Sequence, residues 1–286
     1  MNGNQKLKIS MGLLGNGIAK SRMAKLQNFL GKLQGIDIDY VLIDGASLKE
    51  FNCLDEIKQR ITQGYYGLNI THPFKEQVLS IVDAPLVEEH RQIGSYNTLK
   101  FIDGQILGAN TDYSGFIRGY RSKFPNTPPG KVLICGAGGV GRAIAFALTS
   151  LEASQICIYD LQHSKAENLC AALQNHGANC KAISRASLEQ TMLESDGLVN
   201  CTALGMYEYP GSAFPEKYIG RQRWAFDAVY TPLKTEFMLA CEQHNLSCIT
   251  GFDLWIYQGL DAFTLFTGVT VNDQDTVIST ALSWLD

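Results

Sequence analysis

A glycine-rich run followed at a distance by a carboxylate is the clearest chemical pattern in this chain. Gly136-Ala137-Gly138-Gly139-Val140-Gly141 has the spacing GxGxxG, and Asp160 comes roughly 20 residues later. Such a turn exposes backbone N–H groups at a helix start, where phosphates bind. The later carboxylate can accept hydrogen bonds from ribose hydroxyls and repels the extra phosphate of NADP. The pattern therefore predicts a dinucleotide site that prefers NAD.

The segments around the glycines have the order that this site requires. Residues 131–135 form an apolar strand pattern, an alanine-rich helical run follows the glycines, and residues 155–159 form a second strand pattern that ends at Asp160. The alternative is an ordinary tight turn in a buried β-α-β unit. The complete strand, turn, helix, strand and acid order favours the cofactor site.

A second group of polar residues precedes the glycine run. Asn69, Thr71 and Lys75 lie where a short strand meets an expected helix, and Asn97 and Asp112 flank an expected hairpin. Donors and acceptors at strand ends suit a small polyhydroxylated ligand. Each residue also has a structural alternative: a solvated lysine, helix caps at Asn69 and Thr71, and turn residues at Asn97 and Asp112.

The elements that position these residues alternate between strand and helix patterns along the whole chain. We expect an α/β fold: an N-terminal α/β substrate domain, a Rossmann-type doubly wound parallel sheet, and a C-terminal helical segment that packs back on the first domain. A helix is expected to begin near Pro73, where the missing N–H costs nothing. We place the substrate-binding catalytic domain at residues 1–115 with 252–286, and the NAD(P)-binding domain at 116–251.

Composition excludes several classes of function. The 286 residues are 45% hydrophobic and 18% charged, with a formal net charge of −4 and no basic run, so nucleic acid and membrane partners are not expected. The start lacks the apolar core of a signal peptide, and we expect a cytoplasmic protein. The eight cysteines include no CxxC and are expected to be reduced. The five histidines show no metal-ligand spacing, so no metal is expected.

Taken together and in order, these motifs resemble the shikimate/quinate dehydrogenase family from Gly12 to about Gly268. Asp160 makes the NAD-using quinate/shikimate branch the better match, and Lys165 leaves room for weaker use of NADP. The motifs that carry the resemblance are residues 69–75, 97–98, 110–112, 136–141, 200–206, Gln258 and 266–268.

The resemblance implies a role for each matching residue. Lys75 is the catalytic lysine and Asp112 its partner, both holding the ring hydroxyl that is oxidised. The substrate-binding set comprises Ser21, Asn69, Thr71, Asn97, Tyr230 and Gln258. The cofactor-binding set comprises Gly136, Ala137, Gly138, Gly139, Val140, Gly141, Asp160, Thr202, Met206, Val229 and Gly251.

One departure from the family pattern concerns the substrate. Ser21 keeps the first of two hydroxyls that hold the substrate carboxylate, but Met23 replaces the second and Ala24 replaces the following proline. The expected activity is reversible oxidation of shikimate to 3-dehydroshikimate, or of quinate to 3-dehydroquinate. An amino-substituted or otherwise modified shikimate is an alternative substrate.

Two other classes of protein stay open. One is a catalytically idle nucleotide-sensing paralogue, and the other is a hydride-transfer enzyme acting on a folate or an aldehyde. The expected partner is a small hydroxylated cyclic carboxylate, and the protein is expected to be a monomer or homodimer. The residues do not decide how strict the NAD preference is, or whether the role is biosynthetic or catabolic.

Overall fold

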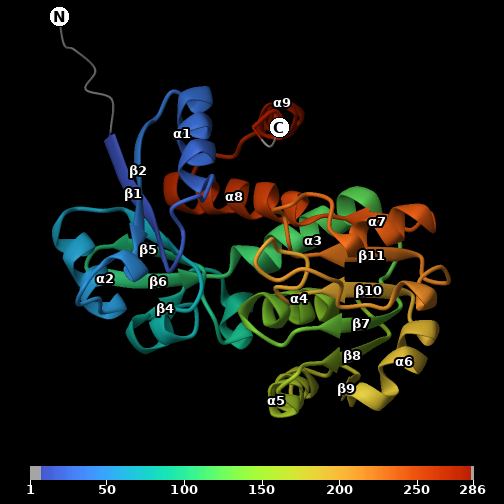
Figure 1. Ribbon diagram of the computed structural model, residues 1–286. Helices are drawn as coiled ribbons and strands as arrows, with labels where there is room; N and C mark the ends of the chain where they lie inside the picture. The colour runs from blue at the N-terminus through green and yellow to red at the C-terminus, as the bar shows by residue number, and fades with distance from the viewer. Residues whose placement is uncertain (1–7, 285–286) are drawn as a thin grey trace, which may run out of the picture. The chain divides into compact units, whose positions relative to one another are not determined.

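The computed structural model describes residues 8–284, which form two compact units (Figure 1). The first unit contains the described residues up to Thr111 and those from Gln258 onward, and the second contains Asp112–Tyr257. Both boundaries fall inside continuous helices, α3 (Thr111–Lys123) and α8 (Gly251–Thr267). The boundaries expected from the sequence, after residue 115 and before residue 252, lie in the same two helices.

The first unit is built on a mixed six-stranded sheet in the order β2-β1-β3-β5-β6-β4. Strands β1, β2 and β3 are parallel, while β3, β5 and β6 are antiparallel neighbours. Its elements are β1 (Lys8–Gly15), α1 (Met23–Gln34), β2 (Asp37–Asp44), α2 (Cys53–Thr62), β3 (Gly67–Ile70), β4 (Ala84–Pro85), β5 (Thr98–Ile102), β6 (Gln105–Ala109) and α9 (Gln274–Leu282), with short 3₁₀ helices at Gly45–Ser47, Gln77–Ile81 and Glu88–Ile93.

Helix α2 begins at Cys53, where the side chain of Asn52 caps it by accepting from the N–H groups of Leu54 and Asp55. One helix prediction in this unit needs correction. No α-helix begins at Pro73: the segment forms turns and then the 3₁₀ helix Gln77–Ile81. Its first backbone bond, from Phe74 N to Thr71 O, spans three residues rather than four, so Lys75 lies in a turn.

The C-terminal helix packs on this first sheet, as the sequence predicts. A Cβ added at Gly67 in β3 would lie 2.6 Å from the ring of Phe266, so only glycine lets α8 approach this strand. Lys100 in β5 also donates from Nζ to the carbonyl of Leu265 at 2.6 Å. These contacts hold the part of α8 that begins at Gln258 against β3 and β5.

The second unit has a fully parallel six-stranded sheet in the order β12-β11-β10-β7-β8-β9 (Figure 1). The chain winds outward from β7 in both directions, so the doubly wound topology predicted from the sequence is confirmed, with its switch point between β7 and β10. Its elements are α3, β7 (Lys131–Cys135), α4 (Gly139–Ser150), β8 (Gln155–Tyr159), α5 (His163–Gln174), β9 (Cys180–Ala182), α6 (Leu188–Glu194), β10 (Gly197–Asn200), β11 (Trp224–Asp227), α7 (Glu236–Gln243) and β12 (Ser247–Ile249), with 3₁₀ helices at Arg185–Ser187 and Glu216–Tyr218.

The expectation that all cysteines are reduced is wrong for one pair. Cys170 in α5 and Cys180 in β9 form a disulfide, with their Cα atoms 5.3 Å apart. Helix α5 packs directly on the edge strand β9, which brings two buried cysteines within the distance that a disulfide needs. The six other cysteines are free thiols.

Within residues 8–284, no helix combines the length and apolar character needed to cross a membrane. The same residues contain no cluster of three or more His, Cys, Asp or Glu side chains that could hold a metal ion.

Candidate active site

The glycine run forms a tight turn between β7 and α4. Gly136 has a φ of +99°, which side chains rarely adopt, and a Cβ there would lie 2.7 Å from the carbonyl of Cys201. A Cβ at Gly141 would lie 1.9 Å from the carbonyl of Gly136. Glycine at both positions therefore allows the turn and the close packing of the helix behind it.

The start of α4 is open toward a ligand. Gly138 is the N-cap, no side chain caps the helix, and its first turn contains no acidic residue. A Cβ at Gly138 would meet nothing within 4 Å, so space exists beside the first N–H groups. The positive end of the helix dipole and these N–H groups fit a pyrophosphate.

Asp160 follows β8 and is tied to the glycine turn. Its Oδ2 accepts from the backbone N–H of Ala137 at 2.8 Å, and its Oδ1 accepts from that of Gln162 at 2.8 Å. The residue is half-buried. A carboxylate has about four lone-pair sites, so each oxygen can still accept from a ribose hydroxyl.

A buried pair, Asn200 at the end of β10 and Asp227 at the end of β11, holds the loops at the switch point. Asn200 Nδ2 donates to Asp227 Oδ1 at 2.9 Å, and Asn200 Oδ1 accepts from the N–H and hydroxyl of Thr202. Asp227 also accepts from Val229 N at 3.0 Å and from Thr235 Oγ1 at 2.6 Å. Burial raises the pKa of Asp227 to about 6.

Asn200 and Asp227 thus fix Thr202 and Val229, two residues of the predicted cofactor set. Asp227 is not among the site residues predicted from the sequence. The sequence does contain a signal for Asp227, since Asn200 and Asp227 are each the polar last residue of an otherwise apolar strand of the parallel sheet.

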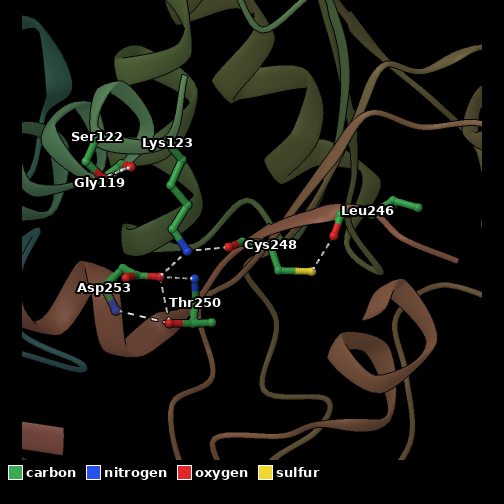
Figure 2. A network of polar contacts seen from close by, with 7 residues as sticks. All are labelled: Gly119, Ser122, Lys123, Leu246, Cys248, Thr250 and Asp253. Carbon is green, nitrogen blue, oxygen red and sulfur yellow. Dashed lines mark hydrogen bonds and ion pairs between the residues drawn. The ribbon is translucent and has the colours of Figure 1, made fainter. Parts of the chain in front are cut away.

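The start of α8 lies against the loop after β11. A Cβ at Gly251 would lie 2.6 Å from the carbonyl of Ala228 and 2.7 Å from that of Val229, so only glycine fits. Figure 2 shows how this helix start is held: Asp253 Oδ2 accepts from the N–H and hydroxyl of Thr250 and from Lys123 Nζ. Lys123 belongs to α3 and also donates to the carbonyl of Cys248.

In the first unit, Asn97 and Gln258 meet at Thr111. Asn97 Oδ1 accepts from Thr111 N at 2.7 Å, and Thr111 Oγ1 donates to Gln258 Oε1 at 3.3 Å. Asn97 is buried and Gln258 is half-buried. Two predicted substrate ligands, far apart in the sequence, are therefore neighbours.

Asn69 lies near the end of β3, and Thr71 directly follows this strand. Asn69 is 3% exposed; its Oδ1 accepts from Tyr40 OH at 2.8 Å and its Nδ2 donates to Thr98 Oγ1 at 3.0 Å. The alternative of a helix cap at Asn69 is excluded, since the residue lies in a strand and bonds other strands. Thr71 is half-buried, and its N–H donates to the carbonyl of Leu14 at 2.9 Å.

Lys75 and Asp112 belong to different units. Lys75 is half-buried in the turn after β3, and its carbonyl accepts from Tyr96 N. Asp112 is 6% exposed and lies in the first turn of α3. Their joint action on one hydroxyl stays a prediction.

Ser21 is half-buried before α1, and its Oγ accepts from Met23 N at 3.3 Å. Met23 is 4% exposed, and Gln27 Nε2 lies 3.6 Å from its Sδ while donating to the carbonyl of Gly259 at 2.8 Å. The methionine that departs from the family pattern therefore packs from the first turn of α1 against Gly259 in α8.

Two large aromatic residues near the candidate site, Trp255 and Tyr96, have clear packing roles. Trp255 stacks on Tyr230, with ring centroids 6.3 Å apart and an interplanar angle of 9°. Tyr96 is 5% exposed and covers Gly108, where a Cβ would lie 2.7 Å from its ring. Met206, in contrast, is 37% exposed in the loop after β10.

The comparisons with known proteins agree with this geometry. The family model for the shikimate dehydrogenase substrate binding domain matches residues 13–99. The quinate/shikimate dehydrogenase (NAD(+)) of Corynebacterium glutamicum strain R is 34% identical over 266 residues, which cover 91% of this chain and 94% of that protein.

Two solved structures extend the likeness to the fold. Quinate dehydrogenase from Corynebacterium glutamicum in complex with NAD has a TM-score of 0.90 and 33% identity, covering 96% of this chain and 99% of that chain. Shikimate 5-dehydrogenase from Thermus thermophilus in complex with NADP(H) and shikimate has a TM-score of 0.84 and 27% identity, with the same coverage. Since the likeness spans nearly the whole chain, this protein belongs to the shikimate/quinate dehydrogenase family.

Proposed function

We propose that this chain is an NAD-dependent oxidoreductase that acts reversibly on a ring hydroxyl of shikimate or quinate, giving 3-dehydroshikimate or 3-dehydroquinate. The observation that carries the proposal is the likeness over nearly the full chain to a quinate dehydrogenase in complex with NAD. The polar residues of the first unit and the glycine turn of the second fit this chemistry.

The second unit is proposed to bind NAD, with NADP as a weaker alternative. The first N–H groups of α4 would hold the pyrophosphate, and Asp160 would accept from the adenosine ribose hydroxyls. Thr202, Met206, Val229 and Gly251 are proposed to flank the nicotinamide. The bound nicotinamide supplies the acceptor for the hydride that leaves the substrate carbon.

The first unit is proposed to bind the ring. Lys75 takes the proton of the hydroxyl that is oxidised and returns one in the reverse direction, while Asp112 orients the same hydroxyl. Thr71, Asn97 and Gln258 would hydrogen-bond the other ring oxygens. The contacts of Asn69 with Tyr40 and Thr98 support a role in orienting those ligands rather than in touching the ring.

Ser21 is proposed to hold the substrate carboxylate, with Tyr230 beside the ring. Since Met23 offers no donor, fewer side-chain hydroxyls are available to the acid group here than in the family pattern. We also propose a cytoplasmic protein that is a monomer or homodimer. We propose that the first unit binds the substrate and the second binds the cofactor.

A substrate panel tests this proposal. Pure protein would be mixed with shikimate or quinate and with NAD or NADP, and the absorbance of reduced nicotinamide would give kcat/KM for each pair. We expect turnover of at least one acid, with NAD preferred over NADP. Turnover of neither acid with either cofactor would refute the proposed function.

A further inference from the structure

A buried chain of hydrogen bonds runs through the first unit from β2 to α8. It begins at Tyr40 in β2, passes through Asn69 in β3 and Thr98 in β5, and reaches Asn97, Thr111 and Gln258. Its donor–acceptor distances lie between 2.7 and 3.3 Å. Five of its six residues are less than 9% exposed, and Gln258 is half-buried.

The orientation of Asn69 is determined at one end of this chain. Its Oδ1 accepts from Tyr40 OH, while its Nδ2 faces the carbonyl of Asn97 at 3.4 Å and Thr98 Oγ1 at 3.0 Å. A carbonyl can only accept, so the amide cannot be reversed without placing two acceptors face to face. Burial raises the pKa of Tyr40 well above its ordinary value, which keeps the phenol protonated as a donor.

The orientation of Asn97 follows in the same way. The backbone N–H of Thr111 lies 2.7 Å from Asn97 Oδ1 and can only donate. The hydroxyls of Thr98 and Thr111 each lie 3.1 Å from the same oxygen, which is therefore surrounded by donors. Asn97 Nδ2 must therefore face the other way, and within residues 8–284 it has no hydrogen-bond acceptor.

The hydroxyl of Thr111 lies between two amide oxygens. Its Oγ1 is 3.1 Å from Asn97 Oδ1 and 3.3 Å from Gln258 Oε1, within donating distance of both. The Nε2 of Gln258 then points away from Thr111, and the described part of the chain provides it with no acceptor.

We propose that Thr111 is a positioning residue that binds the oxygen ends of Asn97 and Gln258, so that both amides present N–H donors to the ligand. The ligand must then offer two oxygen acceptors on this side, as hydroxyl or carbonyl groups of a ring do. The identity of the ring substrate in this inference rests on the proposed function. The orientation of the two amides does not depend on it.

The first test compares T111V with T111S. Valine keeps the shape and removes the hydroxyl, whereas serine keeps the hydroxyl. T111V should raise KM for the ring substrate by roughly three- to tenfold with a smaller change in kcat, because one hydrogen bond that orients Gln258 is lost. KM for NAD should not change, and T111S should restore the wild-type KM.

T191V is a matched control. Thr191 is 7% exposed in α6, and its hydroxyl donates to the carbonyl of Ser187. This variant loses a comparable buried hydroxyl and should leave both KM values unchanged. Equal KM values for T111V and wild type would overturn the inference.

The second test needs no substrate. In ¹⁵N-labelled protein, the side-chain amide resonances of Asn97 and Gln258 should shift in T111V and stay in place in T191V. Unshifted amide signals in T111V would overturn the inference. A wild-type protein that turned over neither acid would refute the proposed function, but it would not by itself overturn the inference about Thr111. If T111V does not fold, T111A replaces it, with the same expected shifts of the Asn97 and Gln258 amide signals, and unmoved signals would again overturn the inference.

Discussion

Asp160 Oδ2 accepts a hydrogen bond from the backbone N–H of Ala137 at 2.8 Å. This bond joins the end of β8 to the glycine turn after β7, so one carboxylate both closes the turn and borders the proposed ribose position. The same residue therefore affects the shape of the phosphate site and the choice between NAD and NADP.

The D160A variant should lose preference for NAD. Removing the carboxylate removes acceptors for two ribose hydroxyls and the repulsion of the NADP phosphate, so we expect KM for NAD to rise by roughly ten- to a hundredfold. The ratio of kcat/KM for NAD and NADP checks this. E167A, on the exposed side of α5, is the control and should keep the wild-type ratio. An unchanged ratio in D160A would contradict the assignment of Asp160.

The K75A variant should lose most turnover while it still binds NAD. A positioned proton acceptor contributes about 10²–10⁴-fold to rate, and the loss should appear in kcat. Stopped assays of turnover and NAD titration by fluorescence separate the two effects. K58A removes a lysine from the exposed face of α2 and should behave as wild type. Wild-type kcat in K75A would exclude the role proposed for Lys75.

The M23S variant should improve binding of an acid substrate. A hydroxyl at the first position of α1 adds a donor to the substrate carboxylate, worth roughly a tenfold lower KM. Met23 is 4% exposed and packs beside Gln27, so the free energy of unfolding should fall by about 2–4 kcal/mol at the same time. Steady-state kinetics and urea denaturation measure the two effects. An unchanged or higher KM for both shikimate and quinate would show that this position does not face the acid group.

The stability contribution of Asp227 should depend on pH. Its folded pKa of about 6 lies above the ordinary aspartate value, so the folded state binds the proton more tightly than the unfolded state. The contribution is therefore fully present below about pH 4 and is lost as the pH rises through about 6.

D227N provides the comparison for this effect, since asparagine has the same shape and does not titrate. The free energy of unfolding of wild type minus that of D227N should fall by about 2–3 kcal/mol between about pH 4 and about pH 7. Urea denaturation at several pH values measures this difference. A difference that is constant with pH would mean that Asp227 has an ordinary pKa in the folded protein.

The parts of the fold and site that the sequence predicts well depend on local patterns. The strand, glycine turn, helix and acid between residues 131 and 160 form one β-α-β unit, so spacing along the chain reports the spatial order directly. The alternation of strand and helix patterns likewise predicts the doubly wound sheet. The α-helix predicted to begin at Pro73 does not form. Proline is favourable at a helix start, but its presence does not by itself produce the backbone hydrogen bonds between residues four apart that define an α-helix.

Relationships between distant segments appear only in the tertiary structure. The chain order does not reveal that Thr111 orients both Asn97 and Gln258, because these three residues meet only when the first unit folds. The same holds for the packing of Met23 and Gln27 against Gly259 in α8. The disulfide between Cys170 and Cys180 joins residues closer in the chain, but it depends on how α5 packs on β9. The amino-acid sequence alone is enough to predict the fold class and the cofactor turn from local patterns, and the family from the order of motifs along the chain. Which polar atoms face one another is known only from the folded structure, because hydrogen-bond partners depend on distances of a few ångströms between segments that the sequence separates.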